Sequence, residues 1–323
     1  MKILQELPPA PPPSDTYLTI GVFDGVHRGH QYLLEQVIAQ ARGANALSGA
    51  VTFLNHPRQV LQPAFQAQFL TSVEERLRLL KGAGLDLVAP VTFDLPLSQL
   101  SAHDFLDLLM KRLGMRGLVV GPDFALGRGR EGSVTRLQEL ADEMGFRLEV
   151  VAPQSLGDVL IRSTTVRQAL LEGAVDQARE LLGRNFSLDG AVVHGESRGR
   201  ELGFPTANIS ISAGRVVPPD GVYATWAIVN GVRLLSATNI GVRPTFGDND
   251  RTVETYILDF DEDLYGRSIT IEFVRRLRDE LAFVSIEALK EQMSRDVDET
   301  RALLIAEGME SSQARQPILP VQG

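Results

Sequence analysis

The stretch YLTIGVFDGVHRGHQYLL occupies residues 17–34 and joins an apolar, β-rich run to the start of an amphipathic helical run. Gly21 and Gly25 permit a tight backbone turn between the two. His27 and His30 then fall at the start of the helix, where free N–H groups and the helix dipole favour a phosphate. Two imidazoles there can donate hydrogen bonds to a phosphoryl group that gains charge in a transition state. The alternative is a turn with solvent-exposed histidines, but the coincidence of strand, glycines and histidines favours a phosphate site.

Strands and helices alternate around this stretch as far as residue 184. Ser72 with Glu75, and Ser101 with Asp104, have the spacing of helix-capping motifs. The alternation predicts an α/β domain in which helices cover both faces of a parallel sheet and ligands bind beyond the C-terminal ends of the strands. The predicted strands are residues 17–23, 49–54, 85–91, 117–121 and 146–152, and the predicted helices lie near 30–42, 72–82, 102–113 and 134–144.

Three further segments are expected at this same edge of the sheet. Asn55 follows the second predicted strand directly, in the run Asn-His-Pro. The glycine-rich run GPDFALGRGREG (121–132) follows another strand and contains Asp123 and Phe124. The run STTVR (163–167) opens a helix with hydroxyl groups and places an arginine one turn later, which suits a second phosphate. Each has an ordinary alternative as a loop, a glycine turn or an N-cap, and their shared edge favours a binding site.

The pattern changes at about residue 186, where short alternating strands follow one another. Asn230-Gly231 between two such runs is a strong hairpin signal, and Tyr265-Gly266 marks another turn. The pattern predicts a small antiparallel β-barrel followed by one helix over residues 285–306, with Ser285 as N-cap and Gly308 as its stop. The predicted strands are residues 187–194, 221–229, 233–241, 252–260 and 268–277.

The run GESRGRELGFPTANIS (195–210) is the first candidate site of this second region. Gly199 and Gly203 let backbone amides approach an anion, and Arg198 and Arg200 add positive charge. The Gly-Lys-Ser/Thr ending of a Walker A motif is missing. An ordinary turn held by side-chain hydrogen bonds is the alternative.

Hard-cation ligands and a carboxylate follow in the same region. Thr206 and Asn208 offer neutral oxygens, two residues apart, to a cation such as Mg²⁺. Glu254, in TVETYILDF, is a candidate general base that could take a hydroxyl proton during phosphoryl transfer. The preceding loop GVRPTFGD contributes Arg243 and Phe246. The alternatives are an exposed glutamate on a strand and a phenylalanine that packs in the core.

The HxGH pattern after a first parallel strand resembles the nucleotidylyltransferase superfamily. With LGFPTAN, NIGVRPTFG and VETYILDF in order behind GVFDGVHRGH, the chain resembles the bacterial bifunctional riboflavin kinase/FMN adenylyltransferases over residues 15–305. The resemblance implies a Rossmann-like FMN adenylyltransferase domain at 15–184 and a β-barrel riboflavin kinase domain at 185–308. A proline-containing lead (1–14) and a disordered tail (309–323) complete the expected organisation.

Two reactions follow from this resemblance. ATP phosphorylates the 5′-hydroxyl of riboflavin to give FMN, and the FMN phosphate then attacks the α-phosphate of a second ATP to give FAD and pyrophosphate. His27 and His30 would stabilise the α-phosphoryl transition state, and Glu254 would be the kinase base. The implied nucleotide-binding residues are Gly21, Phe23, Asp24, Ser163, Thr164, Arg167, Gly199, Arg200 and Gly203. The implied flavin-binding residues are Asn55, Asp123, Phe124, Arg243 and Phe246, and Thr206 and Asn208 would hold Mg²⁺.

Two positions depart from the family pattern. The family has Pro-His-Pro where this chain has Asn55-His56-Pro57, and a serine pair where it has Arg162-Ser163. Two alternatives therefore stay open: a riboflavin kinase with a weak or altered adenylyltransferase half, and a flavin or nucleotide sensor without turnover. A sensor would not need a general base.

Composition sets the outer limits. The net charge is −9, and neither half has a basic surplus, which argues against a nucleic-acid partner. There is no cysteine, so disulfides and thiolate chemistry are excluded. No apolar run has the length of a membrane span and the N-terminus lacks a signal-peptide pattern, so we expect a cytoplasmic protein without membrane contact. No obligate protein partner is evident; the expected ligands are riboflavin, FMN, FAD, ATP and Mg²⁺.

Overall fold

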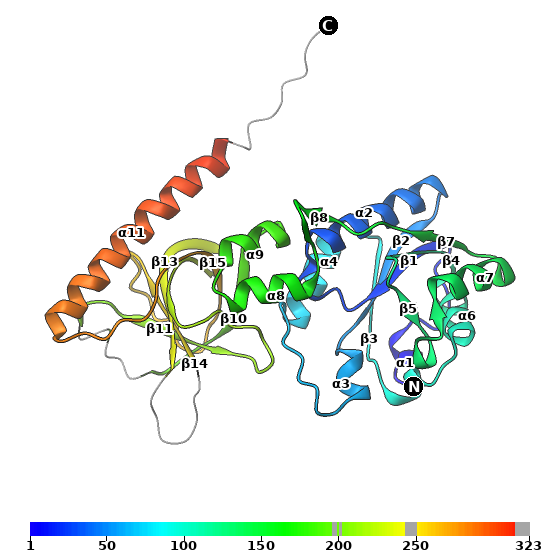
Figure 1. The fold of residues 1–323 in the computed structure, drawn as a ribbon, viewed down its shortest axis with the longest axis horizontal. Helices are drawn as coiled ribbons and strands as arrows, with labels where there is room; N and C mark the ends of the chain where they lie inside the picture. Colours follow the sequence, from blue (N-terminus) through cyan, green and yellow to red (C-terminus); the bar gives the residue numbers. More distant parts are fainter. Residues whose placement is uncertain (196–198, 200–201, 243–250, 314–323) are drawn as a thin grey trace, which may run out of the picture. The chain divides into compact units, whose positions relative to one another are not determined.

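A computed structural model describes residues 1–195, 199, 202–242 and 251–313 (Figure 1). The chain forms two compact units. The first comprises Met1–Val166 and Leu181–Gly183, and the second comprises Arg167–Glu180 and Arg184–Gly323. The division differs from the boundary predicted at residue 184, because it falls within helix α8 (Ser163–Leu171) and assigns α9 (Val175–Leu182) largely to the second unit.

The first unit is built on a five-stranded parallel sheet in the order β3-β2-β1-β4-β7. All five predicted strands are present. The strand order reverses at β1, so the loop that follows β1 lies at the topological switch point where ligands bind in such sheets. The strands are β1 (Thr16–Gly21), β2 (Leu47–Phe53), β3 (Leu87–Val91), β4 (Met115–Val120) and β7 (Arg147–Val150).

The four predicted helices of this unit are also confirmed. The Ser72 side chain accepts a hydrogen bond from the Glu75 amide at 3.2 Å, and Ser101 accepts one from the Asp104 amide at 3.0 Å, as the capping motifs predicted. The helices are α2 (Arg28–Gly43), α4 (Val73–Gly82), α6 (Ala102–Leu113) and α7 (Val134–Met144). Helices α6 and α7 pack on the sheet around buried residues such as Leu106, and α2 and α4 pack on it around Leu34 and Leu80.

Short elements were not predicted, since none is long enough to show a period. They occur mainly in the connections at the C-terminal edge of the sheet. They are η1 (Asp24–Val26), α3 (Pro57–Leu61), α5 (Leu95–Ser98), the hairpin of β5 (Ala125–Leu126) and β6 (Gly132–Ser133) around η2 (Arg128–Arg130), and the hairpin of β8 (Ser155–Leu156) and β9 (Val159–Leu160).

The N-terminal lead is part of the first unit rather than a separate segment. Residues Ile3–Glu6 form α1, and Ile3 is buried in the core that covers the sheet. The Lys2 amide donates to Asp94 at 3.0 Å, and Glu6 accepts from the Thr92 amide at 2.7 Å. A proline-containing lead was predicted for residues 1–14, and its proline run gave no indication of the short helix α1 that precedes it.

The second unit is a closed barrel in the order β10-β11-β14-β13-β12-β15. The five predicted strands are confirmed, and the sixth strand, β11, was not predicted. Asn230 (φ +51°) and Gly231 (φ +80°) form the predicted hairpin turn. The strands are β10 (Phe186–Val193), β11 (Thr206–Ile211), β12 (Gly221–Val229), β13 (Val232–Val242), β14 (Arg251–Ile257) and β15 (Ser268–Arg278). The predicted fold class, an α/β domain followed by a β-barrel with a terminal helix, is therefore confirmed.

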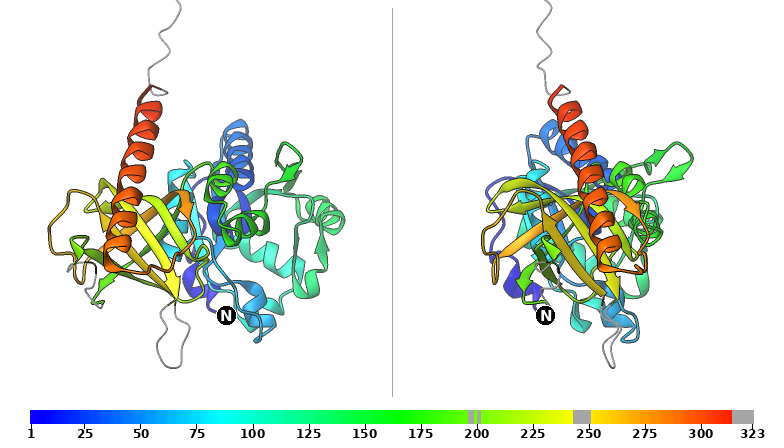
Figure 2. Two further views of the ribbon diagram at one scale, coloured as in Figure 1. Left: turned by 60° about the vertical axis from the view of Figure 1, so that its left-hand side comes forward. Right: turned by 90° about the vertical axis from the view of Figure 1, so that its left-hand side faces the viewer.

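The two faces of the barrel wall differ in character. Side chains on the inner face include a chain of hydroxyls in which Thr225 contacts Thr238 at 2.7 Å and Thr238 contacts Thr255 at 2.7 Å. On the outer face, Ala224 packs against Leu304 of helix α11 (Ile286–Gln313). Helix α11 thus covers one part of the outer face, as both views in Figure 2 show.

Helix α11 begins as predicted, because the Ser285 side chain accepts a hydrogen bond from the Ala288 amide at 3.1 Å. It does not stop at Gly308, and residues 309–313, predicted as disordered, belong to the helix. An interior glycine costs a helix only about 1 kcal/mol. The residue directly before this glycine, Glu307, accepts a hydrogen bond from Arg179 of α9 at 2.7 Å, which anchors this part of the helix.

Among the described residues, no helix has both the length and the apolar character needed to cross a membrane.

Candidate active sites

The two histidines are brought together at the exit of β1. Phe23 adopts a left-handed conformation (φ +52°) and Gly25 has φ +81°, so the chain turns sharply before α2. His27 caps this helix, and its Nδ1 accepts the His30 backbone N–H at 3.3 Å. A neutral His27 that accepts at Nδ1 carries its proton on Nε2. The two rings stack with centroids 3.7 Å apart, so both imidazoles lie at one helix N-terminus.

The His30 ring is enclosed by its neighbours. The ring of Phe23 meets it edge-on at a centroid distance of 5.2 Å, and His30 Nδ1 is buried without a hydrogen-bond partner among the described residues. Burial, and to a smaller extent the charge of His27, holds the pKa of His30 well below its ordinary value of 6.5. His30 is therefore neutral near pH 7.

The glycine between the histidines is required by close packing. A Cβ at Gly29 would lie 3.0 Å from the Ile161 carbonyl oxygen and 3.2 Å from His27 Nδ1. Any side chain at this position would push either on the backbone of the neighbouring segment or on the imidazole. The glycine of the HxGH pattern therefore leaves the His27 ring the space for its observed position.

The start of α8 lies beside this turn, as predicted. The Ser163 hydroxyl donates to the Asp24 carbonyl oxygen at 3.0 Å, and Thr164 is exposed. Arg167 is half-buried and falls in the part of α8 assigned to the second unit.

The Asp24 carboxylate has a different environment from the one predicted for a nucleotide-binding group. It is buried, and its Oδ1 accepts from the Leu70 amide at 2.9 Å and from the Thr71 amide at 3.3 Å. Gly21, at the end of β1, packs against the ring of Phe23. Asp24 and Gly21 therefore shape the turn from within.

A cavity of about 630 Å³ opens beyond the same edge of the sheet. Its lining is largely apolar and aromatic, with cationic side chains among it. The ring of Phe53 meets that of Phe93 edge-on at 5.4 Å in its wall. The lining residues that define it are Ile20, Val22, Phe53, His56, Arg58, Phe93, Phe105, Phe124, Arg128 and Arg130.

Of the flavin-binding residues predicted for this unit, Phe124 alone lines the cavity. Asn55 instead exchanges two hydrogen bonds with the backbone of Phe93, each of 2.9 Å, and so joins the exits of β2 and β3. The exposed carboxylate of Asp123 accepts a hydrogen bond from Arg162 at 2.7 Å. Arg162, one of the two positions that depart from the family pattern, is therefore paired with Asp123. The other phenylalanines of the lining, Phe53, Phe93 and Phe105, come from three different segments and were not predicted, because no local pattern connects them.

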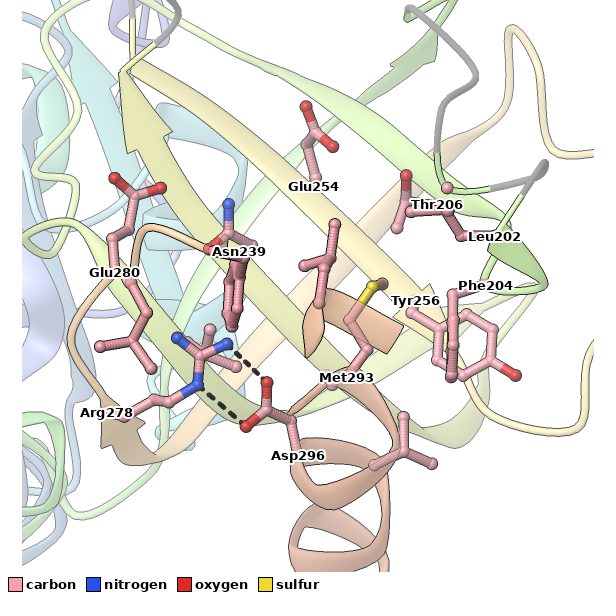
Figure 3. A pocket seen from close by; sticks show the side chains of 17 residues that line it. Leu202, Phe204, Thr206, Asn239, Glu254, Tyr256, Arg278, Glu280, Met293 and Asp296 are labelled. Atoms are coloured by element: carbon pink, nitrogen blue, oxygen red, sulfur yellow. Dashed lines mark hydrogen bonds and ion pairs between the residues drawn. The ribbon is translucent and has the colours of Figure 1, made fainter. Parts of the chain in front are cut away.

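A second cavity, of about 330 Å³, lies between the outer face of the barrel and α11 in the second unit (Figure 3). Glu254 on β14 is directly opposite Asn208 of β11 on one side and Asn239 of β13 on the other. Thr206, two residues before Asn208, shares this face because strand residues alternate. Figure 3 shows Glu254 and Thr206 near one end of the cavity and Asp296 of α11 at another. The predicted base and a predicted metal ligand therefore line one cavity.

The segment before β11 closes on this cavity. Gly199 lines it, and a Cβ there would lie 3.2 Å from the Thr206 hydroxyl and closer still to the Phe204 carbonyl oxygen. Gly203 has φ +90°, which favours glycine. Phe204 meets Tyr256 edge-on at 5.4 Å. The remaining predicted residues Arg200, Arg243 and Phe246 lie outside the described part of the chain.

An ion pair in the cavity wall was not predicted. Arg278, the last residue of β15, donates to the Asp296 carboxylate from Nε at 2.9 Å and from Nη2 at 2.6 Å. Gln292 donates to the same carboxylate at 2.8 Å. The pair joins strand and helix across 18 residues, so sequence spacing gave no signal of it.

Thr206 also lines a third cavity, of about 380 Å³, on the opposite side of β11. It is open and more polar, and its wall includes the segment Phe260–Tyr265. The ring of Tyr265 stacks on His194 at 3.9 Å. Thr206 thus stands between two cavities of the same unit.

Among the residues that the structure describes, no cluster of three His, Cys, Asp or Glu side chains could hold a metal ion alone. A cation at Thr206 and Asn208 would therefore need oxygen ligands from a bound molecule. Neutral oxygens beside one carboxylate are suitable ligands for a hard cation that keeps phosphate ligands.

Comparisons with known proteins match both units. A family model for FAD synthetase matches residues 10–165, and a family model for riboflavin kinase matches residues 182–304. The chain is 40% identical over 287 residues to the bifunctional riboflavin kinase/FMN adenylyltransferase of Escherichia coli (strain K12), covering 88% of this chain and 91% of that protein. A protein of the same name from Listeria monocytogenes is 37% identical over 288 residues, again covering 88% and 91%. The crystal structure of a macrolide-efflux protein from Streptococcus pneumoniae matches with a TM-score of 0.85 at 30% identity, covering 93% of this chain and 97% of that chain.

Proposed function

Because the chain belongs to the bifunctional riboflavin kinase/FMN adenylyltransferase family and carries both activities, we propose that each unit holds one complete active site built from the residues described above. The second unit converts riboflavin and ATP to FMN and ADP. The first unit converts FMN and a second ATP to FAD and pyrophosphate. The observation that supports two sites best is that the paired histidines and Glu254 lie in separate units. Glu254 lines the cavity of the second unit, and the histidines follow β1, from which Ile20 lines the cavity of the first.

The riboflavin kinase reaction needs a general base, because an alcohol is a weak nucleophile near neutral pH. Glu254 lies on the cavity wall between two asparagines, where the ribityl 5′-hydroxyl of a bound riboflavin would reach its carboxylate. The carboxylate accepts the hydroxyl proton as the oxygen bonds to the γ-phosphorus of ATP and the bond to ADP breaks. The apolar part of the cavity, including Met293, takes the flavin ring.

Thr206 and Asn208 are the proposed ligands of the magnesium ion that accompanies ATP in the kinase. Bound Mg²⁺ supplies positive charge that neutralises the transferring phosphoryl group. Thr206 suits this role, since it lines both the cavity assigned to riboflavin and the open polar cavity beside it. We assign ATP to that polar cavity. Gly199 lines the riboflavin cavity beside Thr206, so its segment would cover the phosphates where the two cavities meet at Thr206.

FMN adenylyl transfer needs no base, because the FMN phosphate is already an anion. His27 and His30 donate hydrogen bonds to the α-phosphoryl oxygens, which gain charge as the FMN oxygen attacks and pyrophosphate leaves. Ser163 and Thr164 at the start of α8 hold the triphosphate. The aromatic cavity of about 630 Å³ takes the FMN ring, with Phe124 in its wall and Arg58, Arg128 and Arg130 as cations for its phosphate.

The experiment that tests this assignment follows both products in one assay. Purified protein is incubated with riboflavin, ATP and Mg²⁺, and flavins are separated by chromatography. We expect FMN first and FAD later from the unmodified chain. A variant Glu254→Gln is expected to lose FMN formation but to convert added FMN to FAD, and His30→Asn is expected to do the reverse. Failure of Glu254→Gln to convert added FMN to FAD, or loss of FMN formation in His30→Asn, would contradict separate sites.

A further inference from the structure

Arg76, on helix α4, is fully buried, although arginine seldom occupies such a position. A buried guanidinium is costly unless its charge and its N–H groups are compensated. Arg76 Nη2 donates to the carbonyl oxygens of Phe53 at 2.9 Å and Leu54 at 3.2 Å. Its Nε and Nη1 have no hydrogen-bond partner in the described part of the chain. A leucine would fill this position at lower cost, so the guanidinium needs a reason beyond packing.

The two carbonyl groups mark the point where β2 ends and a long connection begins. This connection, residues 54–72, runs from β2 to α4 and includes α3. It supplies one wall of the first-unit cavity. Arg76 therefore fixes the beginning of the connection that forms one cavity wall. The residues that the connection contributes to this wall are His56, Pro57, Arg58, Leu61 and Gln62.

The other end of the same connection is fixed by the histidine turn. Asp24, three residues before His27, is only 3% exposed, and its carboxylate accepts from the amides of Leu70 and Thr71. The Thr71 hydroxyl in turn accepts from the Gly25 amide at 3.2 Å. The connection thus runs from a strand end held by Arg76 to a segment held by Asp24.

The two anchors are opposite charges in one buried region. Helix α4 packs against η1, which carries Asp24. Burial lowers the pKa of Arg76, and the negative charge of Asp24 acts in the opposite direction. Removal of either charge leaves the other buried and less compensated.

We propose that Arg76 and Asp24 are positioning residues that fix the cavity-wall connection 54–72 relative to the His27 and His30 rings. This inference rests on the proposed function of the first unit, in which the connection aligns FMN with the nucleotide bound at the histidines. Neither side chain touches a reacting atom. Their effect is transmitted through the Phe53 and Leu54 carbonyls on one side and the Leu70 and Thr71 amides on the other.

The test uses the full chain with Arg76→Met, Arg76→Lys and the control Arg78→Met, which alters an exposed arginine of the same helix. FAD formation is measured against FMN at saturating ATP, and against ATP at saturating FMN. Loss of two charged hydrogen bonds is expected to raise KM for FMN in Arg76→Met by about tenfold or more, with KM for ATP little changed. Arg76→Lys should recover part of the loss, because an ammonium keeps the charge and one donor, and Arg78→Met should match the parent.

A merely structural role would remove active molecules, so it would lower the apparent kcat and leave both KM values unchanged. That result, or an unchanged KM for FMN in Arg76→Met, would overturn the proposal. Riboflavin kinase activity of the same preparation measures the amount of intact second unit. His30→Asn serves as a separate check, since retention of FAD formation in that variant would refute the proposed adenylyltransferase site itself rather than the role of Arg76.

A double-mutant cycle covers the case in which Arg76→Met folds but is too unstable for steady-state kinetics. Asp24→Asn keeps the acceptor oxygen for Leu70 and Thr71 but removes the charge. We expect the variant carrying both Asp24→Asn and Arg76→Met to show a first-unit thermal transition less depressed than the sum of the two single effects, because no unpaired charge remains buried. Additive effects would show that the two charges act independently and would overturn their pairing.

Discussion

Substitution of Gly29 by alanine adds one methyl group at the centre of the histidine turn. The new Cβ would lie 3.0 Å from the Ile161 carbonyl oxygen, 3.2 Å from His27 Nδ1 and 3.3 Å from His27 Cε1. Ordinary contacts of this kind exceed 3.4 Å, so either the backbone at Ile161 or the His27 ring must shift by a few tenths of an ångström. The ring is the softer of the two, although it stacks on His30.

Two free energies decide the expected size of the effect. Overpacking by one methyl group costs about 1–3 kcal/mol, and the helical preference of alanine over glycine returns at most about 1 kcal/mol. We therefore expect the stability of the first unit to fall by about 0–3 kcal/mol. Misplacement of a catalytic group by 1 Å costs about 10²-fold in rate, so a shift of a few tenths should lower kcat for FAD formation roughly tenfold or more.

The assay compares initial rates of FAD formation from FMN and of FMN formation from riboflavin in the same preparation. Gly43→Ala is the matched control, because Gly43 ends the same helix and a Cβ there meets nothing within 4 Å. We expect Gly29→Ala to lower kcat for FAD formation roughly tenfold while keeping the rate of FMN formation, and Gly43→Ala to keep both rates. An unchanged kcat for FAD formation in Gly29→Ala would refute the claim that close packing positions the His27 ring for catalysis.

Three further predictions concern the same two sites. Glu254→Gln should lower kcat for riboflavin phosphorylation by about 10²–10⁴-fold and leave riboflavin binding near normal. Kinetics and flavin fluorescence measure the two effects, with the surface variant Glu291→Gln as the control. An unchanged kcat would refute the assignment of Glu254 as the general base. Because the pKa of His30 is lowered in the folded chain, the unfolded chain takes up this proton first, so the unfolding free energy of the first unit should fall as the pH drops through 6.5. Thermal unfolding against pH checks this, and His30→Asn should flatten the dependence in that range. Phe124→Ala should raise KM for FMN roughly tenfold, as expected for loss of a half-buried aromatic contact, and leave KM for ATP unchanged.

Long periodic elements could be predicted from the sequence because local periodicity and caps decide them. The strand-turn-helix around His27 and His30 has this character, and the structure confirms both the turn and the histidine pair. The strand β11 was not predicted as a strand, since Phe204-Pro205 precedes it and its pairing with β14 depends on residues almost fifty positions away. The end of α11 was missed for a similar reason, because a contact from Arg179 holds the helix near Gly308.

The candidate sites show the same limit. Glu254 and Thr206 could be proposed from local motifs, and the barrel register brings them to one cavity. The interpretations of Asn55 and Asp24 as ligand contacts came from their place in motifs, yet in the structure both side chains bond to backbone of distant segments. The burial of Arg76 had no sequence signal, since a single arginine in an amphipathic helix is normally placed on its exposed face.

Mixing two single-site variants tests most directly the claim that each unit holds a complete site. Glu254→Gln and His30→Asn are each given riboflavin, ATP and Mg²⁺ alone, and then together in equal amounts. We predict little FMN or FAD from Glu254→Gln alone, FMN without FAD from His30→Asn alone, and FAD from the mixture, because FMN released by one variant is adenylylated by the other. A mixture that accumulates FMN and forms no FAD would contradict the account.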